Sequence, residues 1–141
     1  MGDGDERKRI IEEIRERRLG NFFYLPGETL NPFTYYEAFN VLVLASKQEA
    51  FSIVLLEAGS CGVPCIGFDV GGNNEVIKDG VTGFLVTDND VAAIAEKILY
   101  LFRNPNQRKV MGEEAKRFVK QYHIDRRVEK LERIFEEAVA G

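Results

Sequence analysis

The sequence of 141 residues is poor in the residue types that build metal and redox sites. Cys61 and Cys65 are separated by three residues, which matches neither a CxxC redox pair nor the ligand spacing of a zinc site. The single histidine, His123, has no second ligand pair beside it. We therefore predict reduced core thiols, a histidine without chemistry, no metal and no cofactor.

An excess of basic charge is missing as well. Lys and Arg number 19 against 23 Asp and Glu, which gives a net charge of -4. Binding to the phosphate backbone of a nucleic acid relies on clustered basic side chains. The Lys and Arg residues instead alternate with acids at helical spacing, as in Glu6–Arg18, which is typical of a solvated face. We expect no nucleic-acid partner.

Long apolar runs and an apolar leader are absent from the sequence too. No run approaches the roughly 20 residues of a membrane-spanning helix, and the first residues are charged where a signal peptide would be apolar. We therefore predict a cytoplasmic protein. Hydrophobic residues make up 45% of the chain, and its length suits one compact domain. We expect a single domain over residues 1–141.

Strand and helix patterns alternate along the first two thirds of the chain. An amphipathic helix is predicted over residues 5–19, and a buried strand over the run FFYL at Phe22–Leu25. Further strands are predicted at residues 41–45, 64–68 and 83–86. Helices are predicted from Asn31-Pro32 through Phe39, from Ile53 to about Cys61 with Ser52 as N-cap, and before Asp79-Gly80 with Asn73 or Asn74 as N-cap.

From Asp90 onward the pattern is helical throughout. One apolar stripe covers 91–102, a break follows at Asn104-Pro105, and two more helices are predicted around 110–122 and 128–138. Strands that alternate with helices predict a parallel α/β sheet, whose ligand crevice lies beyond the carboxyl ends of its strands. The loops after the predicted strands 41–45 and 64–68 lie at that end of the sheet.

Two carboxylates flank the predicted start of one helix. Glu49 lies in the loop after the strand 41–45, and Glu57 lies within the apolar helix that begins at Ile53. A helix N-terminus offers unpaired N–H groups and a positive dipole end, which suit a pyrophosphate. Carboxylates bind vicinal hydroxyls. The two acids therefore suit the sugar on one side of such a diphosphate and the ribose on the other. The alternative is that Glu49 caps a helix and Glu57 forms a surface ion pair, although an acid in this apolar turn needs a partner.

A pair of glycines, Gly71-Gly72, follows the next strand in the sequence DVGGNNEVI. Paired glycines at the carboxyl end of a strand permit positive φ and the close approach of a ligand. Most such pairs are simple turns. Here the pair repeats, one strand along, the geometry expected around Glu49.

The run from Ser46 to Val86, SKQEAFSIVLLEAGSCGVPCIGFDVGGNNEVIKDGVTGFLV, resembles the retaining nucleotide-sugar glycosyltransferases with two Rossmann domains, the GT-B fold. That family carries an E-x7-E motif. GDGDER at Gly2–Arg7 resembles the loop after the second strand of the family's C-terminal domain. The resemblance implies a Rossmann-like parallel sheet with flanking helices, and an enzyme similar to glycosyltransferase family 4.

The resemblance also implies roles for individual residues. Glu49 would contact the transferred sugar and act in catalysis, and Glu57 would bind the ribose hydroxyls. The backbone amides of Phe51, Ser52 and Ile53 would hold the diphosphate of a UDP-, GDP- or ADP-linked sugar. The nucleotide loops would contain Gly27, Gly71 and Gly72.

Two substitutions depart from the family pattern. The family commonly has EGFG where this chain has Glu49-Ala50-Phe51-Ser52, which leaves less room for the backbone to approach a ligand. Asn40 occupies a place that the family usually gives to Asp.

The sequence also resembles only the later part of the family's donor domain. We expect that the first two strands of that domain and the N-terminal acceptor domain are missing. In the family's strand order the missing strands would lie between FFYL and the strand 41–45, which leaves unpaired edges. We predict that FFYL pairs with 41–45 directly, or that a second chain supplies the neighbour in an oligomer.

Three interpretations remain open at this point. The chain is a glycosyltransferase fragment that binds a nucleotide-sugar donor, or a non-catalytic nucleotide-binding or oligomerising module that needs a partner for activity. A flavodoxin-like or receiver-like domain is the third, although a receiver would need paired acids after an N-terminal strand. We expect the isolated chain to lack an acceptor site, and catalysis requires both substrates to be positioned.

Overall fold

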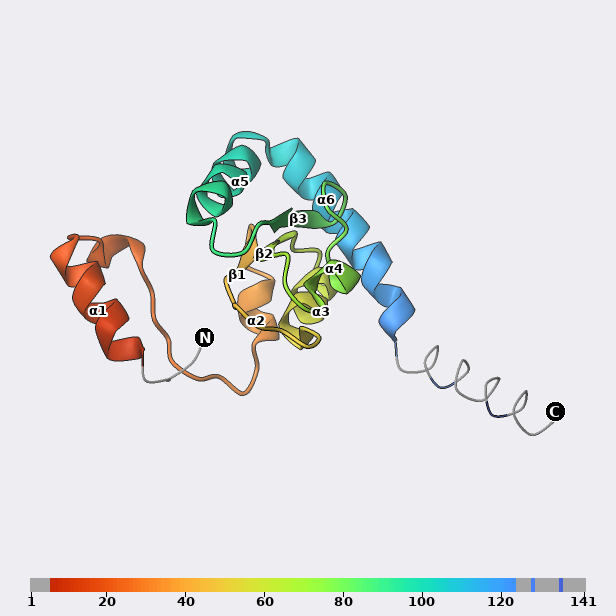
Figure 1. Cartoon of the computed structure of the whole chain (residues 1–141), viewed down its shortest axis with the longest axis horizontal. Helices are drawn as coiled ribbons and strands as arrows, with labels where there is room; N and C mark the ends of the chain where they lie inside the picture. The colour runs from red at the N-terminus through yellow and green to blue at the C-terminus, as the bar shows by residue number, and fades with distance from the viewer. Residues whose placement is uncertain (1–5, 124–127, 129–134, 136–141) are drawn as a thin grey trace. The chain divides into compact units, whose positions relative to one another are not determined.

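The computed structural model describes residues 6–123, 128 and 135, and it divides the chain into two compact units, residues 1–32 and 33–141 (Figure 1). The predicted helix at 128–138, apart from residues 128 and 135, and most of the motif at 2–7 lie outside the described residues. Among the residues described, no helix is both long and apolar enough to cross a membrane.

The first unit contains helix α1 (Arg7–Glu16) and the short 3-10 helix η1 (Gly20–Phe22). The predicted helix over 5–19 is therefore confirmed. Charged pairs support it locally, since the guanidinium of Arg17 lies 2.8 Å from the Glu13 carboxylate one turn earlier. None of the residues 6–32 is buried, so this unit has no apolar core of its own.

The predicted strand FFYL is wrong. Phe22 ends the 3-10 helix, and residues 23–25 form no strand even though Phe23 is extended, with φ -117° and ψ 131°. Strand β1 (Leu42–Leu44) pairs with β2 (Cys65–Phe68) and not with FFYL, so the predicted direct pairing is wrong as well. An extended backbone becomes a strand only when a neighbour accepts its hydrogen bonds. The alternative that a second chain supplies that neighbour stays a prediction.

The second unit is built on a parallel sheet, as predicted. Within the described residues its strands are β1, β2 and β3 (Gly83–Val86), in that spatial order. Leu42 lies beside Cys65, and Cys65 lies beside Gly83 on its other side. The central strand β2 is buried along its whole length, which explains why its sequence does not alternate between polar and apolar residues.

One face of the sheet is covered by the helices α2 (Phe33–Tyr36), α3 (Ile53–Ser60) and α4 (Asn73–Val76) (Figure 1). The apolar cluster on this face combines side chains of these helices with Leu42, Leu44 and Cys65 of the strands. Burial raises the pKa of the Cys65 thiol to about 12, which agrees with a core role for this cysteine.

The opposite face packs on α5 (Val91–Arg103) and α6 (Pro105–Phe118), and the 3-10 helix η2 (Val119–Tyr122) continues α6. Ile66 and Phe68 point to this face, since alternate residues of β2 point to opposite sides of the sheet. The break predicted at Asn104-Pro105 is confirmed, because Pro105 opens α6.

Two predicted helix caps differ in their outcome. Ser52 occupies the N-cap position of α3 as predicted, but its side chain makes no capping hydrogen bond. Neither Asn73 nor Asn74 caps α4, because Gly72 occupies that position and the Asn73 side chain donates to the Phe68 carbonyl at 3.0 Å. Asn73 thus ties the start of α4 to the end of β2.

Candidate functional site

The loops that carry the predicted site residues lie at the carboxyl edge of the sheet. Residues 45–52 connect β1 to α3, and residues 69–72 connect β2 to α4. Because the strands are parallel neighbours, both loops leave the sheet at the same edge. The structure therefore brings Glu49 and the Gly71-Gly72 pair together.

The two glycines meet the backbone of the neighbouring loop. Gly71 has φ +51°, and a Cβ built on it would fall on the carbonyl oxygen of Glu49. A Cβ on Gly72 would fall on the carbonyl oxygen of Ala50, and the Gly72 amide donates to the Glu49 carbonyl at 3.0 Å. Glycine is needed here for the close approach of the loop that carries Glu49. Sequence reasoning expected a ligand at this position and missed the contact between the loops.

The start of α3 offers free hydrogen-bond donors. Within the described residues, the amides of Phe51, Ser52 and Ile53 make no hydrogen bond to the protein. Ser52 is extended, with φ -89° and ψ 106°, as is usual for the residue before a helix. The unpaired N–H groups and the helix dipole favour an anion at this point.

Glu57 has the partner that its apolar surroundings demand. It lies half-buried on α3, and the hydroxyl of Tyr36 on α2 donates to its Oε2 at 3.0 Å. Tyr36 itself is only 5% exposed. Burial is the main cause that raises the pKa of Tyr36 to about 12, and the hydrogen bond to Glu57 and its charge add to the effect.

The Glu49 carboxylate is placed differently. Glu49 is half-buried in its loop, and its backbone carbonyl accepts from Gly72. Its side chain makes no hydrogen bond or ion pair with the part of the chain that the structure describes. One acid of the pair is therefore held by the protein, and the other is available to a ligand.

An aromatic contact holds Phe51, which lies between the two acids in the sequence. The ring of Phe51 lies 5.6 Å from that of Tyr122 in η2. The Tyr122 hydroxyl in turn donates to the carbonyl of Glu75 at 2.7 Å, which connects the start of α3 with α4. Sequence reasoning placed Tyr122 at the end of the helix predicted around 110–122 and missed this contact, since it joins residues far apart in the chain.

The sequence matches the family model described as "Glycosyl transferases group 1" over residues 1–118. The chain belongs to this family. Among curated relatives, it is 33% identical to the N-acetyl-alpha-D-glucosaminyl L-malate synthase of Bacillus anthracis, over 96% of this chain and 36% of that protein. It is 37% identical to the trehalose synthase of Pyrococcus horikoshii, over 83% of this chain and 27% of that protein.

Solved glycosyltransferase structures share the fold. Sucrose-phosphate synthase from Thermosynechococcus elongatus superposes with a TM-score of 0.87 at 29% identity, over 99% of this chain and 36% of that one. The pneumococcal O-GlcNAc transferase GtfA, in complex with UDP and GlcNAc, gives 0.83 at 27% identity, over 98% and 28%. The predicted fold class, a Rossmann-like α/β domain of GT-B type, is confirmed. The chain spans 15% to 39% of the length of the curated relatives it matches.

Within this glycosyltransferase chain, Gly27 lies in the first unit and the other predicted site residues lie in the second. Gly27 has φ +81° and open space where a side chain would be. Its expected role beside a nucleotide base stays a prediction. The prediction of one donor-binding domain over residues 1–141 likewise stays a prediction.

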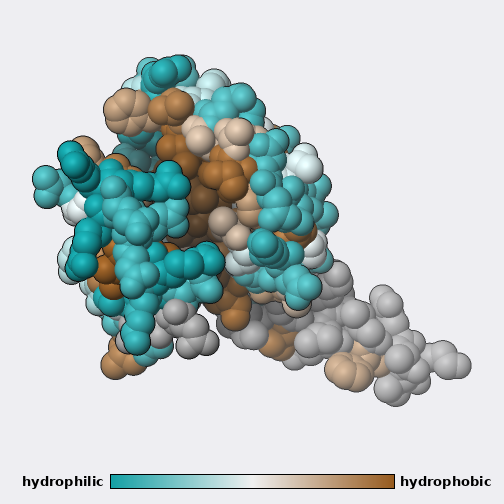
Figure 2. Space-filling model, turned by 60° about the vertical axis from the view of Figure 1, so that its left-hand side comes forward, coloured by the Kyte–Doolittle hydropathy of each residue, from teal (hydrophilic) through white to brown (hydrophobic). Residues whose placement is uncertain are grey.

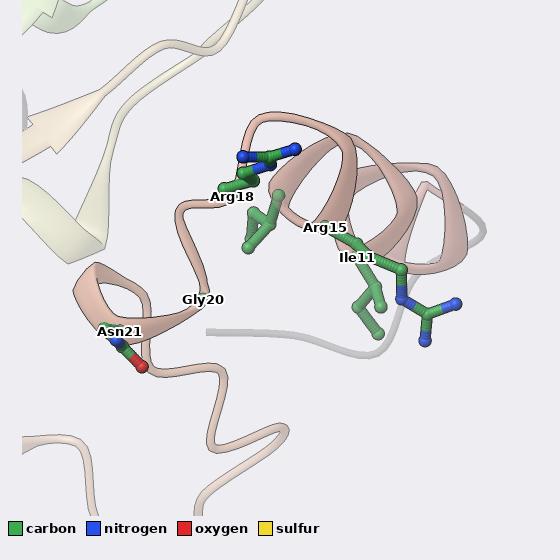
Figure 3. A pocket seen from close by; sticks show the side chains of 6 residues that line it. Ile11, Arg15, Arg18, Gly20 and Asn21 are labelled. Atoms are coloured by element: carbon green, nitrogen blue, oxygen red, sulfur yellow. The ribbon is translucent and has the colours of Figure 1, made fainter.

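The first unit also has an open hollow on α1 (Figure 3). Arg15 and Arg18 belong to its lining, and their guanidinium groups point in different directions in this view. They do not converge on a single anion, so the hollow is no candidate for the diphosphate site. Among the described residues no group of three or more His, Cys, Asp or Glu could hold a metal ion.

The residue that sequence reasoning missed most clearly is Tyr36. The predicted helix through Phe39 contained it, but nothing in its spacing pointed to α3. The sequence did hold one signal for such a contact, since Glu57 lies in an apolar helix and needs a hydrogen-bond partner. A tyrosine on a neighbouring apolar helix is a suitable donor, because its ring can be buried while its hydroxyl reaches a polar group.

Proposed function

We propose that this glycosyltransferase chain binds the nucleoside diphosphate part of a nucleotide-sugar donor at the carboxyl edge of its sheet. One observation carries the proposal. The free amides of Phe51, Ser52 and Ile53 open α3 between the two carboxylates of Glu49 and Glu57. Three donors at the positive end of a helix suit a diphosphate, and the flanking acids suit hydroxyl groups.

The two acids take different parts of the donor in this proposal. Glu57 binds the ribose hydroxyls, and Glu49 lies beside the transferred sugar as the catalytic residue. Gly71 and Gly72 leave room for the Glu49 loop, since each would clash with it if it carried a side chain, and the Gly72 amide holds the loop by donating to the Glu49 carbonyl. Support for a UDP-linked donor comes from the structural neighbour GtfA, which is described as a complex with UDP and GlcNAc at 27% identity.

Transfer to an acceptor is proposed for the whole protein rather than for these residues alone. This chain covers only 36% of each of two proteins named above, the N-acetyl-alpha-D-glucosaminyl L-malate synthase and the sucrose-phosphate synthase. We propose retaining transfer by the whole protein, with the acceptor bound outside the donor site described above. Because a transition state is stabilised only when both substrates are positioned, the isolated chain is expected to bind a donor without transferring its sugar.

Titration of the chain with UDP, GDP and ADP, followed by thermal unfolding, tests the donor site. A ligand at 100 times its dissociation constant stabilises the fold by about 2.7 kcal/mol. We expect Glu57→Gln to weaken binding at least about tenfold, which corresponds to about 1.4 kcal/mol. Glu113→Gln, an exposed acid on α6, is the matched control and should bind like the wild type. Absence of a shift with all three nucleotides would contradict the proposal.

A second candidate is a non-catalytic nucleotide-binding or oligomerising module, and the sheet edge favours it. In the part of the chain described, β1 pairs on one side only, and Val43 in its centre is 37% exposed. An apolar hollow lies nearby, lined by Asn40, Val41, Ile98, Leu101, Phe102 and Arg108. Figure 2 shows brown, apolar surface on the face turned to the viewer.

Unpaired edges with apolar surface favour association. Sedimentation at increasing protein concentration tests it. A mass that stays that of one chain at all concentrations would rule out the oligomer.

A further inference from the structure

Tyr36 is a buried polar residue whose hydroxyl has one defined partner. Its ring packs edge-on against Phe33 and Phe39, with centroids 6.0 and 5.9 Å away. The hydroxyl leaves this apolar cluster and donates to Oε2 of Glu57 at 3.0 Å. Because the surrounding rings fix the tyrosine, its hydroxyl is held at one point on the surface of α3.

The hydrogen bond restricts what Glu57 can do. A free glutamate samples several rotamers, and its carboxylate can turn about its last bond. With Oε2 held by Tyr36, rotation of the carboxylate is restricted and Oε1 remains to accept from a ligand. Such a carboxylate is preorganised for a hydroxyl group in one position.

Glu49 provides the contrast inside the same site. Its carboxylate has no partner among the described residues, whereas Glu57 is held. The acid proposed for the ribose is therefore oriented before any ligand arrives. The acid proposed for the sugar stays free to adapt.

We propose that Tyr36 is a positioning residue that orients Glu57 toward the ribose hydroxyls and makes the site selective for ribonucleoside diphosphates over their 2′-deoxy forms. This inference rests on the proposed donor site. A site arranged to hydrogen-bond a hydroxyl rejects a ligand that lacks it, because the polar group of the protein is left unpaired. Selectivity should therefore depend on the Tyr36 hydroxyl as well as on Glu57.

Calorimetric titration of the full chain with UDP, GDP and ADP, each against its 2′-deoxy form, tests the inference. We expect the wild type to prefer the ribonucleotide at least about tenfold. Tyr36→Phe should lose most of that preference, with weaker binding of the ribonucleotide and unchanged binding of the deoxynucleotide. Glu57→Gln should abolish the preference, and adding Tyr36→Phe to it should change nothing further. A role of Tyr36 in folding alone would weaken both ligands equally.

Tyr35→Phe is the matched control, because it removes a hydroxyl from the neighbouring position of α2 and should keep the wild-type preference. If Tyr36→Phe fails to fold, Tyr36→Met makes the same test, since it also removes the hydroxyl while its flexible apolar side chain fills the cluster. A preference that survives removal of the Tyr36 hydroxyl but is lost in Glu57→Gln would overturn the role of Tyr36 alone. Equal binding of all nucleotides by wild type and Glu57→Gln would instead remove the proposed ribose site itself.

Discussion

Two phenylalanines, one in each unit of this chain, differ in their exposure to solvent. Phe22 in the first unit is 81% exposed, whereas Phe68 in the second unit is 3% exposed. Both lie in short aromatic or β-branched runs that resemble buried strands. The second run has a parallel strand on each side, and the first has none.

The difference separates local from long-range causes of structure. Helix α1 forms in the first unit because charges and apolar residues at helical spacing support it without a core. A strand cannot form in this way, since its hydrogen bonds must come from another segment. Residue pattern alone therefore settled the helix of the first unit and misled at FFYL.

The largest difference in unfolding free energy is expected between alanine substitutions of the two phenylalanines. Phe68→Ala should cost about 3–5 kcal/mol of unfolding free energy, because it opens a cavity in a closed core. Phe22→Ala should change the free energy by less than about 0.5 kcal/mol, as is usual for exposed positions. Urea unfolding followed by circular dichroism measures both. Similar losses in the two variants would show that the first unit buries Phe22 in solution.

Raising the pH should affect the second unit through Tyr36. The folded protein binds the Tyr36 proton more tightly than the unfolded chain, since its pKa is raised to about 12 from an unfolded value of about 10. This contribution is fully present below pH 10 and is lost as the pH rises toward 12. The unfolding free energy of the wild type should therefore fall more steeply between pH 10 and 12 than that of Tyr36→Phe. Tyr24→Phe, in the first unit, is the control for the loss of one phenol, and equal slopes for wild type and Tyr36→Phe would contradict the expectation.

A smaller effect is expected at the two helix starts. The Asp90 side chain caps α5 by accepting from the Ala93 amide at 2.8 Å, whereas Glu6 before α1 makes no capping bond. Asp90→Ala should cost about 1 kcal/mol, and Glu6→Ala less than about 0.5 kcal/mol. Thermal unfolding of both variants measures the difference. A larger loss of unfolding free energy from Glu6→Ala than from Asp90→Ala would contradict the expectation.

Much of the second unit was predictable because its signals are local. The runs at 41–45, 64–68 and 83–86 are apolar and bounded by turns, and each contains a strand of the structure. The caps were less predictable. Asn73 is a good N-cap residue by type, but its side chain found a carbonyl in β2 instead, and that contact depends on the packing of the sheet.

The candidate site divides along the same line. The sequence by itself determined that Glu49, Gly71 and Gly72 follow parallel strands, and that Glu57 lies on the helix after Ser52, because these facts depend on order and local pattern. Only the tertiary structure decided which groups touch. Glycines expected to face a ligand face the loop of Glu49.

Tyr36 shows the same limit most clearly. Its hydroxyl meets Glu57 although 21 positions separate the two residues, and the strand β1 lies between them in the chain. The sequence required a partner for a carboxylate in an apolar helix, since burial without one is costly. Which side chain fills that requirement depends on how α2 packs against α3. Packing of this kind is fixed by shape and burial over the whole core, and no short pattern of residues records it.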